Sequence, residues 1–169
     1  IGPPMQVSLF SAKQMQELID VAKKSERLRA HLSLHASHQD KVQMLLIALI
    51  KGTYIPPHFH KNIWQWEYFQ VINGEVELYV FDENGKVKNI FQLGGQHGAL
   101  FAKIEPNTIH TLVCRSSHAV VLEVKEGPFL ELDAKVVPFW SCIESYKEIS
   151  REKIIYKLEN LSVGQVYKV

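Results

Sequence analysis

The sequence predicts an all-β sandwich or barrel with an N-terminal helix and a short C-terminal helical segment. Seven short apolar or alternating runs fill the middle of the chain, and Gly, Asn and Pro separate them. No helical pattern lies between these runs, so the strands are expected to pair in a sandwich or barrel, not in a parallel sheet with crossover helices. The runs are 41–50, 66–72, 75–81, 87–91, 99–104, 109–114 and 119–125.

The size and charge of the chain limit the classes of protein that it can belong to. Its 169 residues, 46% of them hydrophobic, are about one domain's worth of chain and enough to form a core. Nineteen Lys and Arg against 18 Asp and Glu leave a formal charge of +1, which does not indicate a nucleic-acid partner. With only two cysteines, a disulfide framework is excluded.

No membrane or secretion signal is visible. The longest apolar candidate, Met44 to Ile50, has the length of a strand and not of a membrane span. Residues 1–4 lack the charged and apolar regions of a signal peptide. We therefore expect a cytoplasmic protein that has no membrane partner.

The two helices are predicted from capping boxes followed by apolar residues at helical spacing. Ser11 and Gln14 form the first box, and the helix is expected over about 11–25. Ser145 and Glu148 form the second, and that helix is expected within about 146–160. No linker or repeat interrupts the chain, so residues 1–169 are taken as one domain with its β-barrel at about 26–137.

Three dipeptides mark turns between the predicted strands. Asn73-Gly74 and Asn84-Gly85 are typical of hairpins, because Asn and Gly tolerate the positive φ of tight primed turns. Gly94-Gly95 indicates a further break.

The residues that carry chemistry begin with the pair His58 and His60. On a strand, side chains two positions apart face the same side, so both imidazoles are expected to point inward and Phe59 outward. Glu67 lies at an odd offset from His60, so the chain must bend between them, and Lys61-Asn62-Ile63 is a plausible loop.

A third imidazole comes from far along the chain, at His110. It follows Pro106-Asn107, which predicts a tight turn because Asn can take a positive φ. Three neutral imidazoles and the Glu67 carboxylate suit one divalent transition-metal ion, such as Zn, Fe(II), Mn, Ni or Cu. The alternative is a set of hydrogen-bonded histidines around a metal-free sugar-binding pocket, with Glu67 as an acceptor or a general base.

These residues resemble the first motif of the cupin superfamily: a Gly, five residues, His-x-His, a gap, a Glu, six residues and a Gly. The matching positions are Gly52, His58, His60, Glu67 and Gly74. The gap between His60 and Glu67 is longer than in the family pattern. The second cupin motif is matched more loosely, with Asn107 standing at its Gly, and it ends in His110.

More narrowly, residues 25–130 resemble the WbuC family of small cupin-fold metalloproteins. This resemblance implies a double-stranded β-helix (a cupin jelly-roll barrel), a bound divalent metal and a link to bacterial surface-polysaccharide (O-antigen) biosynthesis, but no defined reaction. Ser33 stands where such families usually have Asn. The resembling blocks are Arg29–His35, Asp40–Leu45, Tyr54–His60, Phe81–Gly85 and Glu123–Pro128.

The functional hypothesis is a metal-dependent enzyme, an isomerase or an oxygenase, that acts on a small polar or sugar-derived molecule such as a nucleotide sugar. The alternative is a non-catalytic module that binds or senses a sugar. His35 and Gln43 are candidate substrate contacts, although a histidine satisfied at a strand end explains His35 equally well. Arg29 is a candidate phosphate contact. The chain is expected to form a homodimer.

Overall fold

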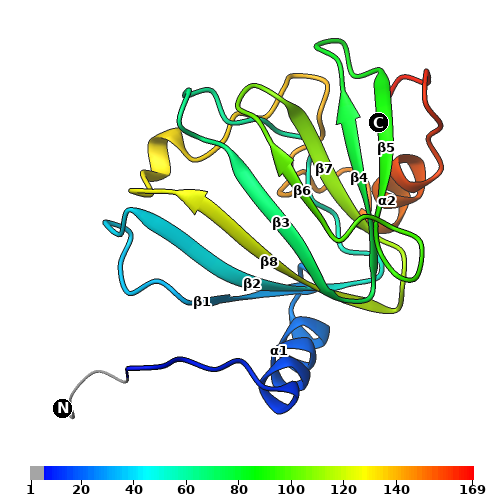
Figure 1. Ribbon diagram of the computed structural model, residues 1–169. Coiled ribbons are helices and arrows are strands. Elements are labelled where there is room, and N and C mark those ends of the chain that lie inside the picture. Colours follow the sequence, from blue (N-terminus) through cyan, green and yellow to red (C-terminus); the bar gives the residue numbers. More distant parts are fainter. Residues whose placement is uncertain (1–5) are drawn as a thin grey trace.

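The computed structural model describes residues 6–169 and consists of two antiparallel sheets that face each other (Figure 1). Residues 1–5 lie outside the described part, and with them the expectation about a signal peptide at residues 1–4. The strands in the five-stranded sheet are, in order, β1 (Arg29–Ser33), β2 (Val42–Ile50), β8 (His118–Glu126), β3 (Glu67–Asn73) and β6 (Phe101–Ile104). Those in the three-stranded sheet are β5 (Val87–Gly94), β4 (Glu75–Phe81) and β7 (Ile109–Cys114).

This arrangement confirms the all-β prediction and is consistent with a jelly-roll. The strand pairings of residues 6–169 form two separate sheets and not one closed barrel. Alternating residues of both sheets point into the space between them, where Leu49, Leu78 and Leu112 belong to one buried apolar cluster. At one end of this space the inward positions become polar, and the candidate site lies there.

Helix α1 (Ala12–Lys24) covers the outer face of the five-stranded sheet (Figure 1). Its capping box is formed as predicted, with the backbone nitrogen of Gln14 3.2 Å from Ser11 Oγ. Ile19 and Ala22 are fully buried in the cluster that also holds Ala48 of β2.

Helix α2 (Arg151–Glu159) packs Ile154 and Leu158 against the outer face of the three-stranded sheet. The predicted cap at Ser145 was wrong, because the helix begins after Ser150, whose side chain accepts a hydrogen bond from the Lys153 backbone. Ser150 directly precedes the first helical turn, which contains Ile154, whereas residues 145–149 are not helical. Neither helix of the described part has the length and hydropathy needed to cross a bilayer.

The turn dipeptides gave mixed results. Asn84-Gly85 joins β4 to its antiparallel neighbour β5, as predicted, with Gly85 at a φ of 85°. Asn73-Gly74 is not a hairpin turn: it carries the chain from β3 in one sheet to β4 in the other. The β3 strand pairs with β8 and β6 instead, because its inward residues face the core between the sheets.

Strand β1 is missing from the predicted runs. Its inward positions are occupied by Arg29 and His31, which line a cavity, while Ala30 faces α1. A strand whose inner residues are polar lacks the alternating hydrophobic pattern by which a strand is recognised in a sequence.

Replacing Gly74 by alanine should lower the free energy of unfolding by about 2–4 kcal/mol, from strained backbone and overpacking together. Gly74 has a φ of 80°, and a Cβ there would lie 2.4 Å from the His118 carbonyl oxygen. Gly164 is the matched control, since its φ is 92° but nothing lies within 4 Å of an added Cβ. Urea unfolding should show the larger loss at Gly74, and equal losses would contradict the steric argument.

Candidate metal centre

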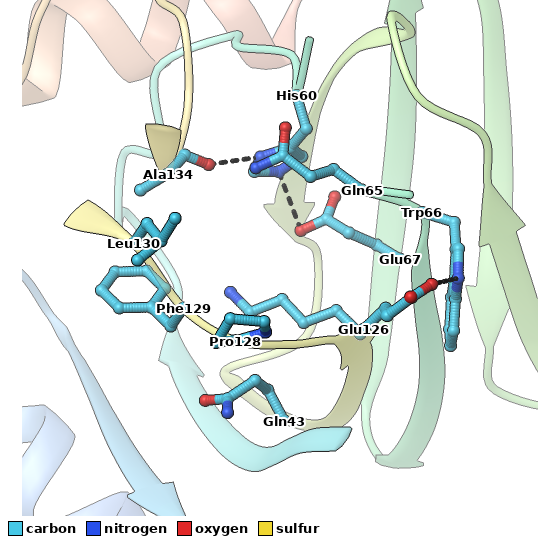
Figure 2. A pocket seen from close by; sticks show the side chains of 11 residues that line it. Gln43, His60, Gln65, Trp66, Glu67, Glu126, Pro128, Phe129, Leu130 and Ala134 are labelled. Carbon is cyan, nitrogen blue, oxygen red and sulfur yellow. Dashed lines mark hydrogen bonds and ion pairs between the residues drawn. The ribbon is translucent and has the colours of Figure 1, made fainter. Parts of the chain in front are cut away.

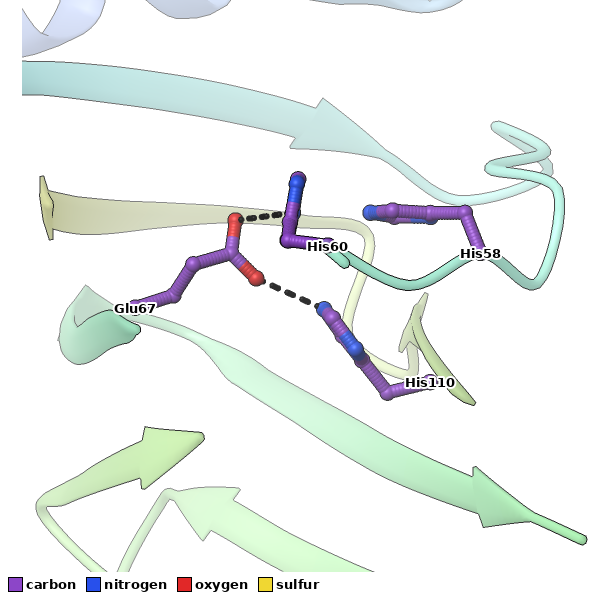
Figure 3. A group of neighbouring side chains, drawn as sticks. All are labelled: His58, His60, Glu67 and His110. Carbon is purple, nitrogen blue, oxygen red and sulfur yellow. Dashed lines mark ion pairs between the residues drawn. The ribbon is translucent and has the colours of Figure 1, made fainter. Parts of the chain in front are cut away.

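Four side chains from three parts of the chain meet at one end of the space between the sheets (Figure 3). His58 and His60 come from the segment before β3, Glu67 is the first residue of β3, and His110 lies near the start of β7. Their candidate ligand atoms all lie within 4.8 Å of one another, and all but His58 are buried. The structure thus brings together the four residues that the sequence singled out.

Backbone hydrogen bonds hold the segments of this cluster in place. The amide of His58 donates to the His110 carbonyl at 3.1 Å, and the amide of His110 donates back to His58 at 2.9 Å. Asn107 has a φ of 61°, in the left-handed region that the sequence predicted. Its backbone amide donates to the His60 carbonyl at 2.7 Å. The backbone amide of Gln65 donates a hydrogen bond to the Asn62 carbonyl and so closes a turn. This turn lets the Glu67 side chain point toward the histidines despite its odd offset from His60.

All three imidazoles are oriented in the same way. In each ring Nδ1 lies at a backbone carbonyl, and because a carbonyl can only accept, Nδ1 must carry the hydrogen. A neutral ring then presents the lone pair of Nε2, as in histidines that bind metals. Nδ1 of His58 lies 2.8 Å from the carbonyl oxygen of Pro56, and Nδ1 of His110 lies 2.7 Å from that of Thr108. Nδ1 of His60 contacts the carbonyl oxygen of Ala134.

The Glu67 carboxylate faces two of these lone pairs. Its Oε1 lies 3.1 Å from Nε2 of His60, and its Oε2 lies 2.8 Å from Nε2 of His110. Both Nε2 atoms and Oε2 are buried without a hydrogen-bond partner. Lone pairs held this close to a carboxylate need a cation between them, either a proton or a metal ion. A divalent ion would satisfy all these atoms at once, so the donor set fits one.

The electrostatics of the cluster follow from burial and from the close carboxylate. Burial by itself would raise the pKa of Glu67, but His110 and His60 hold it well below its usual value. Burial would lower the pKa of His110, but the close contact with Glu67 and the negative charge of that residue outweigh this effect and raise it. Burial, assisted by His110, lowers the pKa of His58 to about 3, so that ring is neutral near pH 7.

A cavity of about 270 Å³ opens onto the cluster. Apolar residues such as Ile47, Phe69 and Val121 form part of its wall, and basic side chains form another part. A smaller cavity of about 30 Å³ adjoins it, shares His60 and Glu67 with it, and is drawn in Figure 2.

Two of the predicted substrate contacts line these cavities, but their polar groups are already engaged. Arg29 lines the larger cavity, and its guanidinium lies 2.7 Å from both carboxylate oxygens of Glu144. Gln43 lines the smaller cavity, and its amide nitrogen donates to the Asp40 carbonyl at 2.7 Å. Both contacts hold the walls of the cavities together.

The third predicted contact, His35, lines neither cavity. Its Nδ1 lies 3.0 Å from the backbone nitrogen of Met44 and 2.9 Å from the oxygen of the same residue. The position of His35 matches the alternative of a histidine satisfied at a strand end.

Sequence reasoning missed Glu123, which lies beside Glu67 in the larger cavity and is 5% exposed. Burial first, and then the neighbouring Glu67, raise the pKa of Glu123 to about 8. A signal for it was present, because Glu123 shares the inward phase of Ala119 and Val121 on β8. A carboxylic acid at a core position is unusual enough to indicate a role.

The raised pKa of Glu123 predicts how stability changes with pH in the metal-free protein. The folded state keeps a proton on Glu123 that the unfolded state releases above about pH 4.5, so stability falls as pH rises toward 8. Glu123→Gln removes this titration. In urea unfolding the wild type should lose a few kcal/mol more than the variant between pH 5 and pH 8. Parallel losses in both proteins would show that Glu123 ionises normally.

Two solved structures that align with a TM-score of 0.50 agree with this fold. A cupin 2 conserved barrel domain protein from Rhodopseudomonas palustris aligns with a TM-score of 0.50 at 16% identity, over 65% of this chain and 66% of that one. A protein from Shewanella oneidensis aligns with a TM-score of 0.50 at 14% identity, over 63% of this chain and 72% of that one. A cupin-2 domain protein from Rhodospirillum rubrum gives 0.49 at 9% identity, over 65% of each chain. The alignments thus span slightly less than two thirds of the two cupin chains.

The chain thus has a cupin-like fold that carries a candidate His/Glu metal centre. More specifically, residues 10–93 match the model of a domain of unknown function, DUF6016. No curated protein matches the sequence.

Proposed function

We propose that the chain binds one divalent transition-metal ion, Zn, Fe, Mn or Ni, through His58, His60, Glu67 and His110. The observation that carries this proposal is the common orientation of the three rings, each with Nδ1 at a carbonyl and Nε2 facing the cluster. Proton-mediated contacts would explain one or two of these rings. They do not explain His58, because in the described part of the chain the ion pairs of Glu67 are with His60 and His110.

We further propose that the protein is an enzyme, of isomerase or oxygenase type, that acts on a small polar or sugar-derived molecule. A metal in this donor set supplies Lewis-acid, water-activating or oxygen-binding chemistry. The chain's own contribution is Glu123, because a carboxyl with a pKa of about 8 can hold a proton near pH 7 and give it up to a neighbouring group. The apolar walls of the larger cavity limit the access of water to Glu123 and to the cluster of possible metal ligands.

Elemental analysis of the purified protein, together with anomalous scattering, tests the metal. Close to one ion per chain is expected. Protein that remains far below that value after incubation with Zn, Fe(II), Mn and Ni in turn would refute the site.

Turnover separates the enzyme from the alternative, a non-catalytic module that binds or senses a sugar. A panel of simple sugars and nucleotide sugars should be supplied to protein loaded with each metal. Conversion of one of them supports the enzyme, whereas binding without conversion by any metal form supports the module. The residues shared with WbuC cupins extend the proposal to surface-polysaccharide synthesis, and the homodimer and the cytoplasmic location stay predictions from the sequence.

A further inference from the structure

The larger cavity carries more positive charge than its own residues neutralise. Arg27, Arg29, Lys125 and Lys135 all line it, whereas its acidic residues are Glu67 and Glu123. Glu144, outside the lining, offsets part of this charge. Four cations against at most three carboxylates leave at least one positive charge in excess, before any divalent ion is counted.

The two arginines are not free to bind a ligand. Glu144 contacts Arg29 at 2.7 Å and Arg27 at 3.0 Å, and the Arg29 side chain is only 4% exposed. The two arginines share this one carboxylate, so one of their two charges is balanced, and the contacts hold both side chains in the wall of the cavity.

The two lysines are much less constrained. Lys135 is exposed and forms no ion pair with any residue in the described part of the chain. Lys125 has only a loose contact with a carboxylate, since its Nζ lies 3.8 Å from Oε1 of Glu123, and it also lies 5.5 Å from the centre of the Phe129 ring. Two ammonium groups at one cavity therefore lack a close anionic partner.

The crowding of these cations is visible in their neighbours. Partial burial, and then the charges of Arg29 and Arg27, lower the pKa of His31, which lines the same cavity, to about 4. Partial burial, and then Arg29, also lower the pKa of Lys135. Lys135 is thus held where the field is already positive, and an anion bound there would relieve this repulsion.

We propose that the ligand of this cavity is a small organic oxyanion whose carboxylate or phosphate group is bound by Lys125 and Lys135. A volume of about 270 Å³ lies just below the usual range of small-molecule sites, about 300–1,000 Å³. A single sugar acid or sugar phosphate suits this size better than a whole nucleotide sugar. The inference rests on the proposed function, because the cavity is the one that opens onto the metal cluster.

Calorimetric titration of zinc-loaded protein tests the inference, with D-glucuronate and D-glucose 6-phosphate as anionic probes and D-glucose as the neutral counterpart. Both anions should bind at least about tenfold more tightly than glucose. The double variant Lys125→Gln/Lys135→Gln should lose about that factor for the anions and nothing for glucose. Lys157→Gln on α2 is the control, because this exposed lysine lines neither cavity and should change nothing.

The outcomes keep this inference apart from the metal proposal. Tighter binding of glucuronate identifies a carboxylate ligand, and tighter binding of glucose 6-phosphate identifies a phosphate ester. Either result supports the inference. Anions that bind no better than glucose, or a double variant that binds them like the wild type, would overturn it. Metal content is measured on the same samples, so protein that takes up no zinc but binds the anions would refute the metal site and leave the anion site standing. A Lys125→Arg/Lys135→Arg variant, which keeps both charges, should retain binding and so excludes misfolding as the cause.

Discussion

Replacing His110 by alanine is expected to lower metal affinity by about 100-fold or more, so that the purified variant contains little of the ion that the wild type holds. Loss of a residue that merely orients a ligand costs 10–100-fold, and loss of a ligand itself should cost at least as much. His110 is 2% exposed, and its Nε2 is the atom closest to Glu67. Elemental analysis after dialysis against one equivalent of zinc measures the effect.

Two further variants make this result interpretable. His97→Ala removes an exposed histidine from the loop between β5 and β6 that does not belong to the cluster, and it should keep the metal content of the wild type. Glu67→Gln conserves the size of the side chain but removes its charge, so it should lose metal even if His110→Ala folds poorly. Wild-type metal content in both His110→Ala and Glu67→Gln would show that other residues hold the ion.

Acidification is expected to strip the metal between about pH 7 and pH 5, because imidazoles must be neutral to bind it and the pKa of His110 is raised above its usual value of about 6.5. At pH 7.5, zinc at about 100 times its dissociation constant should stabilise the fold by about 2.7 kcal/mol, and at pH 5 this gain should disappear. Thermal unfolding with and without zinc at the two pH values measures it.

The metal-free protein should show a different dependence on pH. His110 has a raised pKa, so its contribution to stability is complete below about pH 6.5 and is lost as pH rises through the raised value. Glu67 has a lowered pKa, so its contribution is present above about pH 4.5 and is lost as pH falls through the lowered value. The contact between Glu67 and His110 therefore stabilises the empty site at mildly acidic pH, where metal binds worst.

For the metal-loaded protein, metal retained at pH 4 would indicate ligands other than imidazole.

The candidate site was predictable because local rules define it. The spacing of His58 and His60, and the positive φ at Asn107, follow from the residue types alone. Glu67 was harder to place, since only the turn over residues 62–65 brings it back into phase.

The parts that escaped prediction depend on contacts between distant residues. Glu123 and the inner residues of β1 are polar at inward positions, and only the cavity opposite them explains why a sheet tolerates this. The ion pair of Arg29 with Glu144 joins residues 115 positions apart, which no local pattern indicates. The exchange of sheets at Gly74 was misread because an Asn-Gly turn looks the same whether its strands pair with each other or part.

The carbonyl that orients His60 belongs to Ala134, which follows η1 (Glu131–Asp133) and lies 74 residues further along the chain. Both histidine motifs are synthesised well before that residue. A nascent chain can therefore hold all four clustered residues and still lack the carbonyl that orients His60, so we expect the cluster to reach this arrangement only after the segment beyond β8 has docked.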